Sequence, residues 1–446
     1  MLSCFLLLIF HFANAQIWTE IGGLDALGAN NAILSVCNDA TGNVYAAGGF
    51  QNSSGNFYVS KWNDTSWKEI GGLNALSADS VINTICTDKL GNVYAAGYFK
   101  NPLGKYYVAK WNGANWSELG GVSGLSANNP IWSIVCDSVG NIYASGNFTN
   151  ASGKRYVAKW DGLAWNEVGG LNGLSANNGI ISLAIDESEN IYAAGNFTNS
   201  NGKRYVAKWD GITWSELGGL DALAANNAIN VIYSDLLGNI YSAGSFTNSF
   251  GKHYVAKWNG INWTELGGLN GLAAKSPILS ISSDALGNIY TAGNFTNSSG
   301  KVYLSKWNGS SWSEVGGLNG LNANLFISGI CIDLTGNIYV AGNFSNSNLN
   351  RYVAKYGLVT SIDNLELITH VSTFPNPTSN FTSIDLSIAI MNPLIKVTDC
   401  TGKIIETEIN MIANKVILDL SKHAKGIYFI EIQNDEKIYR GKVLKE

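Results

Sequence analysis

Three ionisable residues recur at a spacing of 49 residues through most of the chain and are the first candidates for chemistry. They are an Asp, a Glu and a Lys, in the series Asp39 to Asp333, Glu20 to Glu314 and Lys61 to Lys355. Carboxylates held close together can act as general acid and base in hydrolysis or elimination. An active site needs different residues at different positions, however, whereas these series place the same three side chains seven times. The recurring charges are therefore predicted to be structural.

Each recurring charge has a predicted role. The Asp begins an Asp-x-x-Gly-Asn turn in most repeats, where its carboxylate can accept backbone N–H groups. In the hairpin from Lys61 to Glu69, pairing Trp62 with Trp67 makes the Lys and the Glu project from opposite faces of the sheet. We expect the Lys of one repeat to approach the Glu of the next as a repeated ion pair.

Outside the repeated positions, candidates for chemistry are few. A copper site with His and Tyr ligands is not expected, because the repeats contain a single histidine, His253. Asp25, Asp79 and Asp221 lie in connecting stretches, and the acidic run 186–190 lacks the ligand spacing and glycine of a calcium loop. No nucleotide-binding loop or Ser-His-Asp pattern is present. We predict no catalysis, no metal and no cofactor.

The elements that carry these residues are short β-strands. Each unit has four β-rich runs bounded by Gly or Asn, which in the third unit are PIWSIVCD, NIYASGNF, KRYVAKW and WNEVGG. Tight hairpin links make them an antiparallel meander. Seven such units predict an all-β fold, a seven-bladed β-propeller over residues 16–357. The chain enters in a fourth strand near Ile17 and leaves at Tyr356 after a third, so the N-terminal strand should complete the last blade.

Crossovers between blades and links between second and third strands should share one face, around the mouth of the central channel. That face is rich in Asn, as at Asn128-Asn129 and Asn177-Asn178, whose amides can bond sugar hydroxyls or simply form loops. The recurring Trp and Tyr residues are predicted to pack between blades and not to serve as sugar platforms.

Departures from the repeat are the better indications of a ligand site. Trp132 stands on a predicted inner strand where other repeats have Leu, Asn, Ile or Ser, and Tyr233, Lys275 and Phe326 are similar exceptions. We predict that these four residues bind ligand, with filling of the channel as the alternative role of Trp132.

The repeats resemble kelch-type propeller repeats. The resemblance rests on Ile-Tyr-x-x-Gly-Gly/Asn-Phe, Tyr-Val-Ala-Lys-Trp-Asp/Asn-Gly and Trp-x-Glu-Leu; the glycine doublet is kept at Gly48-Gly49 and its second glycine is usually Asn elsewhere, as at Asn147. It covers about residues 17–357. The resemblance implies the fold and no function, because propellers include binding modules and enzymes alike.

Both ends of the chain carry predicted export signals. Residues 1–15 join an apolar run to Ala13-Asn14-Ala15, typical of a secretory signal peptide, although no Lys or Arg precedes the run. After a linker over 358–370, residues 371–446 contain three β-rich stretches that fit a small antiparallel sandwich.

This C-terminal segment resembles the type A sorting domain of the type IX secretion system of Bacteroidota. The matching motifs are Phe374-Pro375-Asn376-Pro377, Val397-x-Asp-x-x-Gly402-Lys-Ile, Gly426-Ile-Tyr428-Phe and Lys442-Val-Leu-Lys445. The resemblance implies export to the periplasm, recognition by the outer-membrane translocon, and removal by a sortase on release or surface attachment.

Composition sets the remaining limits. The 446 residues include 28 Lys or Arg and 33 Asp or Glu, a net charge of −5 that argues against a nucleic-acid ligand. No later segment has 18 consecutive apolar residues, so no membrane span is expected. Five cysteines remain after Cys4, without CxxC spacing, which argues against disulfides and zinc. We predict a monomeric, secreted or surface-attached binding or adhesion protein for a glycan or protein. A glycan-degrading hydrolase or lyase and a purely structural surface protein are the alternatives.

Overall fold

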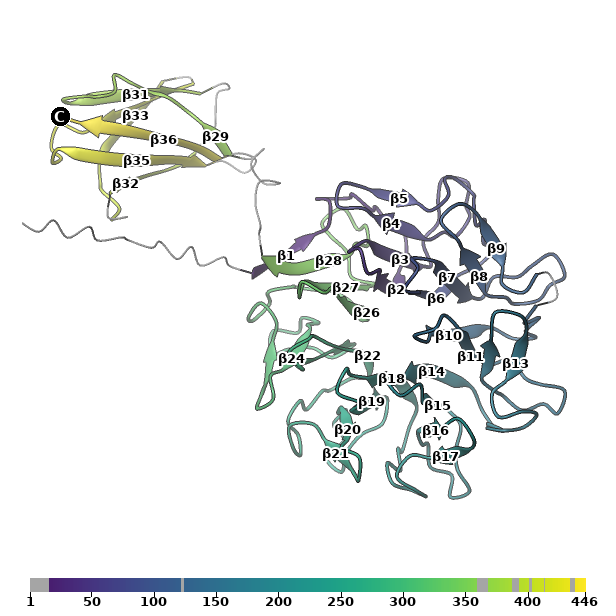
Figure 1. Ribbon diagram of the computed structural model, residues 1–446. Helices are drawn as coiled ribbons and strands as arrows, with labels where there is room; N and C mark the ends of the chain where they lie inside the picture. The colour runs from purple at the N-terminus through teal and green to yellow at the C-terminus, as the bar shows by residue number, and fades with distance from the viewer. Residues whose placement is uncertain are drawn as a thin grey trace, which may run out of the picture. The chain divides into compact units, whose positions relative to one another are not determined.

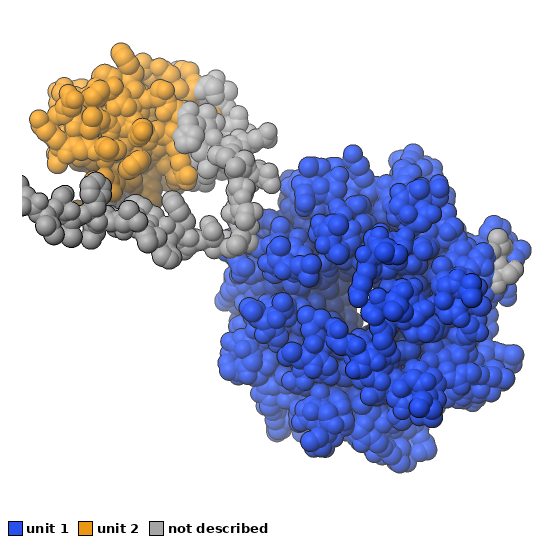
Figure 2. Space-filling view, viewed as in Figure 1, with its two compact units in different colours: residues 1–358 blue, residues 359–446 orange. Residues whose placement is uncertain are grey.

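The computed structural model forms two compact units, residues 1–358 and 359–446, which are described separately (Figures 1 and 2). The predicted signal peptide lies outside the described residues. The structure describes residues 16–121, 124–358, 368–386, 393–400, 403–412, 414–433 and 438–446.

The first unit consists of seven four-stranded antiparallel sheets arranged around a central axis (Figure 1). The innermost strands are β2 (Ile33–Asn38), β6 (Ile82–Thr87), β10 (Ile131–Cys136), β14 (Ile180–Ile185), β18 (Ile229–Ser234), β22 (Ile278–Ser283) and β26 (Ile327–Ile332). The second strands are β3 (Val44–Gly48), β7 (Val93–Gly97), β11 (Ile142–Gly146), β15 (Ile191–Gly195), β19 (Ile240–Gly244), β23 (Ile289–Gly293) and β27 (Ile338–Gly342).

The two outer strands of each blade are short. The third strands are β4 (Ser60–Trp62), β8 (Ala109–Trp111), β12 (Ala158–Trp160), β16 (Ala207–Trp209), β20 (Ala256–Trp258), β24 (Ser305–Trp307) and β28 (Ala354–Leu358). The outermost are β5 (Trp67–Glu69), β9 (Trp116–Glu118), β13 (Trp165–Glu167), β17 (Trp214–Glu216), β21 (Trp263–Glu265), β25 (Trp312–Glu314) and β1 (Gln16–Glu20). The first unit is therefore a seven-bladed β-propeller, as predicted.

The ring is closed by its first strand. β1 pairs antiparallel with β28, with Gln16 opposite Leu358 and Glu20 opposite Ala354, so the seventh blade has the strand order β26-β27-β28-β1. This confirms the predicted closure. It also pairs an edge of the last blade that would otherwise be open.

Each inner strand carries a β-bulge near its start. In blade 3, Ile131 pairs with Gly146 and Ser133 with Ser145, which leaves Trp132 unpaired. A Cβ added at Gly146 would lie 2.2 Å from the carbonyl oxygen of Pro130, so the close approach of the two strands requires glycine there. At this bulge, one residue of each inner strand has no register partner on the second strand.

The hydrophobic core is divided among the junctions between blades. At the junction of blades 2 and 3, Tyr94 packs with Ile131 and Ile142, which are fully buried. The indole Nε1 of Trp165 donates to the carbonyl oxygen of Leu119 in the preceding blade at 3.0 Å, and the same bond recurs at all seven junctions. The prediction that the repeated Trp and Tyr residues pack between blades is confirmed.

The predicted turn role of the repeated Asp is also confirmed. Asp137 Oδ1 accepts the backbone N–H groups of Val139 and Asn141 at 3.1 and 2.8 Å, and Oδ2 accepts the Tyr143 hydroxyl at 3.2 Å. The Tyr hydroxyl bond recurs in all seven blades, at Asp39, Asp88, Asp137, Asp186, Asp235, Asp284 and Asp333.

The predicted Lys–Glu pair between blades is wrong. Lys159 pairs in register with Tyr143 of its own blade, and its Nζ lies 5.4 Å from the centre of that ring. Glu167 instead accepts the side-chain amide of Asn150, in the link of the same blade, at 3.0 Å. Both side chains therefore have partners within their own blade, the Lys on the adjacent second strand and the Glu on the link between the second and third strands.

The second unit is a sandwich of two four-stranded sheets around one core that includes Leu418, Ile430 and Tyr439. One sheet has the order β29 (Ile368–His370), β36 (Ile438–Lys445), β35 (Gly426–Gln433), β32 (Leu394–Asp399). The other has the order β30 (Thr373–Phe374), β31 (Phe381–Asp385), β34 (Lys415–Asp419), β33 (Glu408–Ile412). Contrary to the fully antiparallel expectation, β29 pairs parallel with β36. Strands β28 and β29 thus take up both ends of the stretch 358–370 expected as a linker, and residues 359–367 lie outside the description.

Candidate functional sites

One face of the propeller is formed by the crossovers and the second-to-third-strand links, as predicted. Arg155 in the link of blade 3 pairs through its backbone with Ala176 in the following crossover. The next crossover residue, Asn177, extends to blade 4, because its amide donates to Thr198 Oγ1 at 3.0 Å and its Oδ1 accepts the Thr198 N–H at 2.9 Å. Links and crossovers therefore form a continuous band around the channel, which is hollowed at the centre of the ring (Figure 2). We call this the crossover face.

Trp132 lies at the inner edge of the crossover face, on the bulge of β10. Its indole covers Gly179 of the next blade, since a Cβ added there would lie 2.5 Å from Trp132 Cζ3. Its carbonyl oxygen accepts the Asn83 side chain at 2.9 Å, and its Nε1 is buried without a hydrogen-bond partner. Asn83 thus holds the backbone of Trp132 and Gly179 lies against its ring, while the residue stays partly exposed.

The four predicted ligand residues do not form one cluster. Phe326 is partly exposed directly before β26, and Lys275 is exposed in the crossover from blade 5 to blade 6. Tyr233 is the fifth residue of β18, toward the opposite end of the inner strand, and its hydroxyl lies 2.9 Å from Ser283 Oγ in the next blade. The contact of Tyr233 joins two blades, so Trp132, Lys275 and Phe326 remain as predicted ligand residues on the crossover face.

Three arginines on this face were missed by the sequence prediction. Arg155, Arg204 and Arg351 share one position of the repeat, where other blades have Phe, Tyr, His or Val. Arg155 Nε donates to Asn147 Oδ1 at 3.2 Å and Arg351 Nε makes the equivalent bond to Asn343 at 3.1 Å. The same search for departures from the repeat that singled out Trp132 would have found them.

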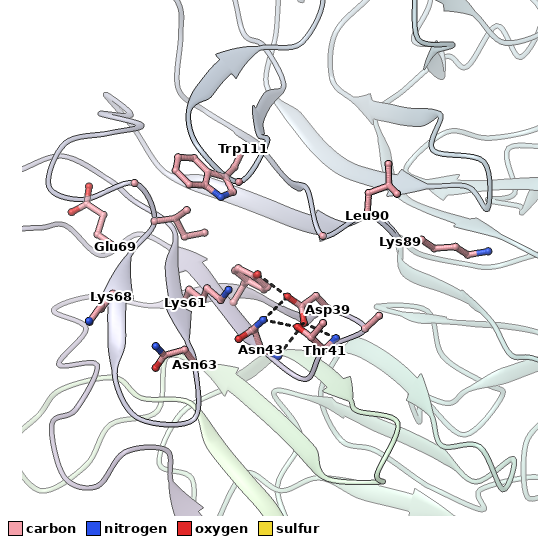
Figure 3. A pocket seen from close by; sticks show the side chains of 16 residues that line it. Asp39, Thr41, Asn43, Lys61, Asn63, Lys68, Glu69, Lys89, Leu90 and Trp111 are labelled. Carbon is pink, nitrogen blue, oxygen red and sulfur yellow. Dashed lines mark hydrogen bonds between the residues drawn. The ribbon is translucent and has the colours of Figure 1, made fainter.

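The opposite face has grooves between the outer hairpin of one blade and the turn of the next. Figure 3 shows the groove of about 520 Å³ between blades 1 and 2, in which Lys61 lies beside the bonded group of Asp39 and Asn43 while Lys68 and Lys89 extend away from it. Burial raises the pKa of Asp39, but hydrogen bonds from Asn43, Thr41 and Tyr45 outweigh it, so the pKa is lowered. An acid that is ionised and fully bonded is a poor proton donor, which argues against catalysis here.

The described part of the chain also shows no candidate site for metal or thiol chemistry. No group of three His, Cys, Asp or Glu residues there has the geometry to hold a metal ion. Cys37, Cys86, Cys136, Cys331 and Cys400 are free thiols. Burial raises the pKa values of Cys37, Cys86 and Cys331, which keeps these thiols protonated and unreactive.

Two of the sequence motifs of the second unit, Pro-Asn-Pro and the chain end, meet at its C-terminal strand. The side chain of Asn376 bonds β36 twice, donating to the Lys442 carbonyl and accepting the Leu444 N–H, each at 2.9 Å. Lys445 is 7% exposed, and its Nζ donates to the Ser379 carbonyl at 2.6 Å. The Pro-Asn-Pro segment and the chain end therefore form one surface patch, in which Pro375 and Pro377 are exposed.

The other predicted motif residues lie apart from this patch. Tyr428 is 5% exposed, and its hydroxyl donates to the Ala424 carbonyl at 2.7 Å. Gly426 begins β35 and Gly402 lies outside the described residues. Within the patch, Asn376 is the residue that ties the Pro-Asn-Pro segment to β36.

Comparison with known protein families identifies the second unit. Residues 372–446 match the family described as secretion system C-terminal sorting domain. The second unit is a type IX sorting domain. The chain is therefore exported and is secreted or attached to the outer-membrane surface, through the secretion machinery that recognises this domain. Among the described residues, no helix is long and apolar enough to cross a membrane.

Three solved structures illustrate the distant similarity of this chain to other proteins. The WD40 β-propeller domain of Doa1 is 12% identical with a TM-score of 0.49, over 76% of this chain and 96% of that chain. A fungal alcohol oxidase of the AA5 family in complex with copper is 11% identical, TM-score 0.49, over 97% and 99%. An ulvan lyase of family PL25 is 13% identical, TM-score 0.43, over 77% and 96%. No curated protein matches the chain. These scores support no statement about ligand or activity, and the kelch relation stays a prediction.

Proposed function

We propose that the propeller is a binding module that holds an extracellular glycan at the channel mouth of the crossover face. The observation that carries the proposal is the contact between Trp132 and Gly179. Neither residue occurs at the equivalent position of any other blade, and the contact leaves a partly exposed Trp on this face. An immobilised aromatic ring offers apolar surface at little cost in conformational entropy, and sugar rings present matching C–H faces.

Polar groups around the indole suit the same ligand class. The exposed side chain of Asn178 lies next to Gly179, and Arg155 flanks the same crossover, whereas the amide of Asn177 is bonded to Thr198. Amides can donate to and accept from sugar hydroxyls at once. The recurring acids, by contrast, are bonded within their blades, and this favours binding over hydrolysis or elimination.

The test is binding of the full chain to a panel of neutral and acidic polysaccharides, with product analysis of the same samples. We expect saturable binding without product, weakened at least tenfold by Trp132→Ala. The matched control is Leu34→Ala, at the equivalent bulge of blade 1, which should leave the affinity within twofold. Product release would favour the hydrolase or lyase alternative. Absence of binding to any polysaccharide would favour a protein partner or a structural role.

A further inference from the structure

Charge is distributed unevenly around the crossover face. We define the basic arc as residues 98–108 and 119–130 of blade 2 and their equivalents at 49-residue intervals through blade 6. These loops contain nine Lys or Arg and one Asp, whereas the corresponding loops of blades 7 and 1 contain one Arg and two Asp. When the Glu that ends each outer strand is also counted, the net charge is +3 for the arc and −3 for the rest of the face. The arc is basic although the chain as a whole is acidic.

The guanidinium groups of the arc are bonded to the protein through only some of their N–H donors. Arg155 uses Nε toward Asn147 and one terminal nitrogen toward the Asn177 carbonyl, at 3.2 and 3.3 Å. Arg204 uses one terminal nitrogen toward the Asn226 carbonyl at 3.2 Å, and its Nε is buried without a partner. A guanidinium has five N–H donors, so each group retains several. Both side chains are partly exposed.

No carboxylate of the propeller neutralises these arginines. The ion pairs within 4.0 Å among the described residues all lie between residues 385 and 440, in the second unit. Asp221, the acid of the arc, accepts the side-chain amides of Asn199 and Asn201 instead. A fixed, planar and unneutralised guanidinium is suited to bidentate binding of a carboxylate or a sulfate.

The two arginines and the indole belong to one continuous stretch of surface. Arg155 bonds the Asn177 carbonyl, and the Asn177 side chain bonds Thr198, which pairs through its backbone with Arg204. Gly179, under the Trp132 ring, is two residues after Asn177. The Trp132 ring and the guanidinium groups of two neighbouring blades are thus connected through the same crossover.

We propose that the basic arc makes the site selective for polyanionic glycans, with Arg155 and Arg204 binding carboxylate or sulfate groups of sugars that lie against Trp132. This inference rests on the proposed function and adds the ligand's charge to it. Successive anionic sugars would meet equivalent forks on consecutive blades, which is the geometry of a repeating ligand.

Three polysaccharides test the inference: dextran sulfate and polygalacturonate, which present sulfate and carboxylate, and unmodified dextran, which is neutral. Binding of the full chain should be saturable for at least one of the two anions and at least tenfold weaker for dextran. The double variant Arg155→Gln/Arg204→Gln should lose about tenfold in affinity for that anion. Which anion binds more tightly identifies sulfate or carboxylate as the group recognised.

The matched control is Lys68→Gln/Lys89→Gln, which removes the same net charge from the opposite face and should change the affinity less than twofold. Equal losses in the two double variants would show general charge attraction and would overturn the inference. Binding of neutral glycans that needs Trp132 but is unaffected by the arginine variant would also overturn it, while leaving the proposed function intact. Failure of Trp132→Ala to weaken any binding would instead contradict the proposed function.

Discussion

The two units of the chain stabilise their charges in different ways. In the propeller, each recurring carboxylate is bonded by amides or hydroxyls of its own blade, and each recurring Lys lies over a Tyr ring. The sorting domain instead forms ion pairs at its surface, such as that of Arg440 with the partly exposed Glu431 at 2.8 Å. A blade meets a near copy of itself on both sides, so contacts completed within one blade work at every junction. A single domain has no such constraint.

The cores differ in the same way. The propeller core is divided into clusters shared by neighbouring blades, whereas the sorting domain has one cluster between its two sheets. We expect this difference to appear as two thermal transitions.

The largest effects should follow from core truncation. Phe148→Ala should destabilise the propeller by about 3–5 kcal/mol and Leu418→Ala the sorting domain by about 2–5 kcal/mol, since both side chains are almost completely buried. Scanning calorimetry of the full chain should show each variant moving only one transition. Movement of both transitions by one variant would mean that the units unfold together.

Loss of a turn carboxylate should come next. Asp137→Ala removes acceptors for two backbone N–H groups, the Asn141 amide and the Tyr143 hydroxyl, and should cost about 2–3 kcal/mol in urea unfolding. Asp161→Ala is the control, because the exposed Asp161 carboxylate accepts the N–H groups of Leu163 and Ala164 and should cost about 1 kcal/mol or less. Equal costs would show that burial of the repeated Asp adds nothing.

Acid should first strengthen and then weaken the propeller. Burial raises the pKa values of Glu20, Glu118 and Glu216 above 4.5, so the folded state gains protons first and its stability rises as pH falls through these values. The pKa values of Asp39, Asp284 and Asp333 lie below 3.8, so the stability they supply above that value is lost as pH falls through the lowered values. Urea midpoints measured from pH 7 to pH 3 should pass through a maximum, and Glu118→Gln/Glu216→Gln should reduce the rise.

The smallest effects should come from cations at the surface, one partly buried and one exposed. Lys208 lies 5.8 Å from the centre of the Tyr192 ring, and Lys208→Gln should cost about 0.5–1 kcal/mol. Lys422 and Glu408 are 3.2 Å apart but 79% and 78% exposed, so Lys422→Gln should cost less than about 0.5 kcal/mol. Urea unfolding followed separately for each unit measures both. A larger loss in Lys422→Gln would reverse the comparison between the two units.

Features set by local and repeated sequence could be predicted. The 49-residue period gave the blades, their phase gave the closure by β1, and the Asp-x-x-Gly-Asn pattern gave the turns. The Lys–Glu pair failed because it assumed contacts between blades. Tyr143 and Lys159 are register partners on adjacent strands. A pairing argument extended from the third strand to the second would therefore have placed the Lys correctly.

The candidate site was only partly predictable. Trp132 stood out as a departure from the repeat, but its support by Gly179 depends on a bulge and on how closely two inner strands approach. The roles of Arg155 and Arg204 depend on carbonyl groups of neighbouring crossovers, which no residue spacing specifies. Tyr233 was singled out by the same rule, yet it joins two blades. Asymmetry identifies unusual residues and cannot separate contacts with a ligand from contacts within the fold.

The pairing of β1 with β28 joins the first strand of the propeller to its last. Twenty-six strands separate the two in sequence, so β1 emerges first and obtains its partner last. The entropic cost of closing a loop grows only with the logarithm of its length, about 0.6 kcal/mol for each doubling. Blades that have already stacked bring the ends nearer and reduce that cost further. The ring becomes complete only when Leu358 is in place, at the boundary where the sorting domain begins.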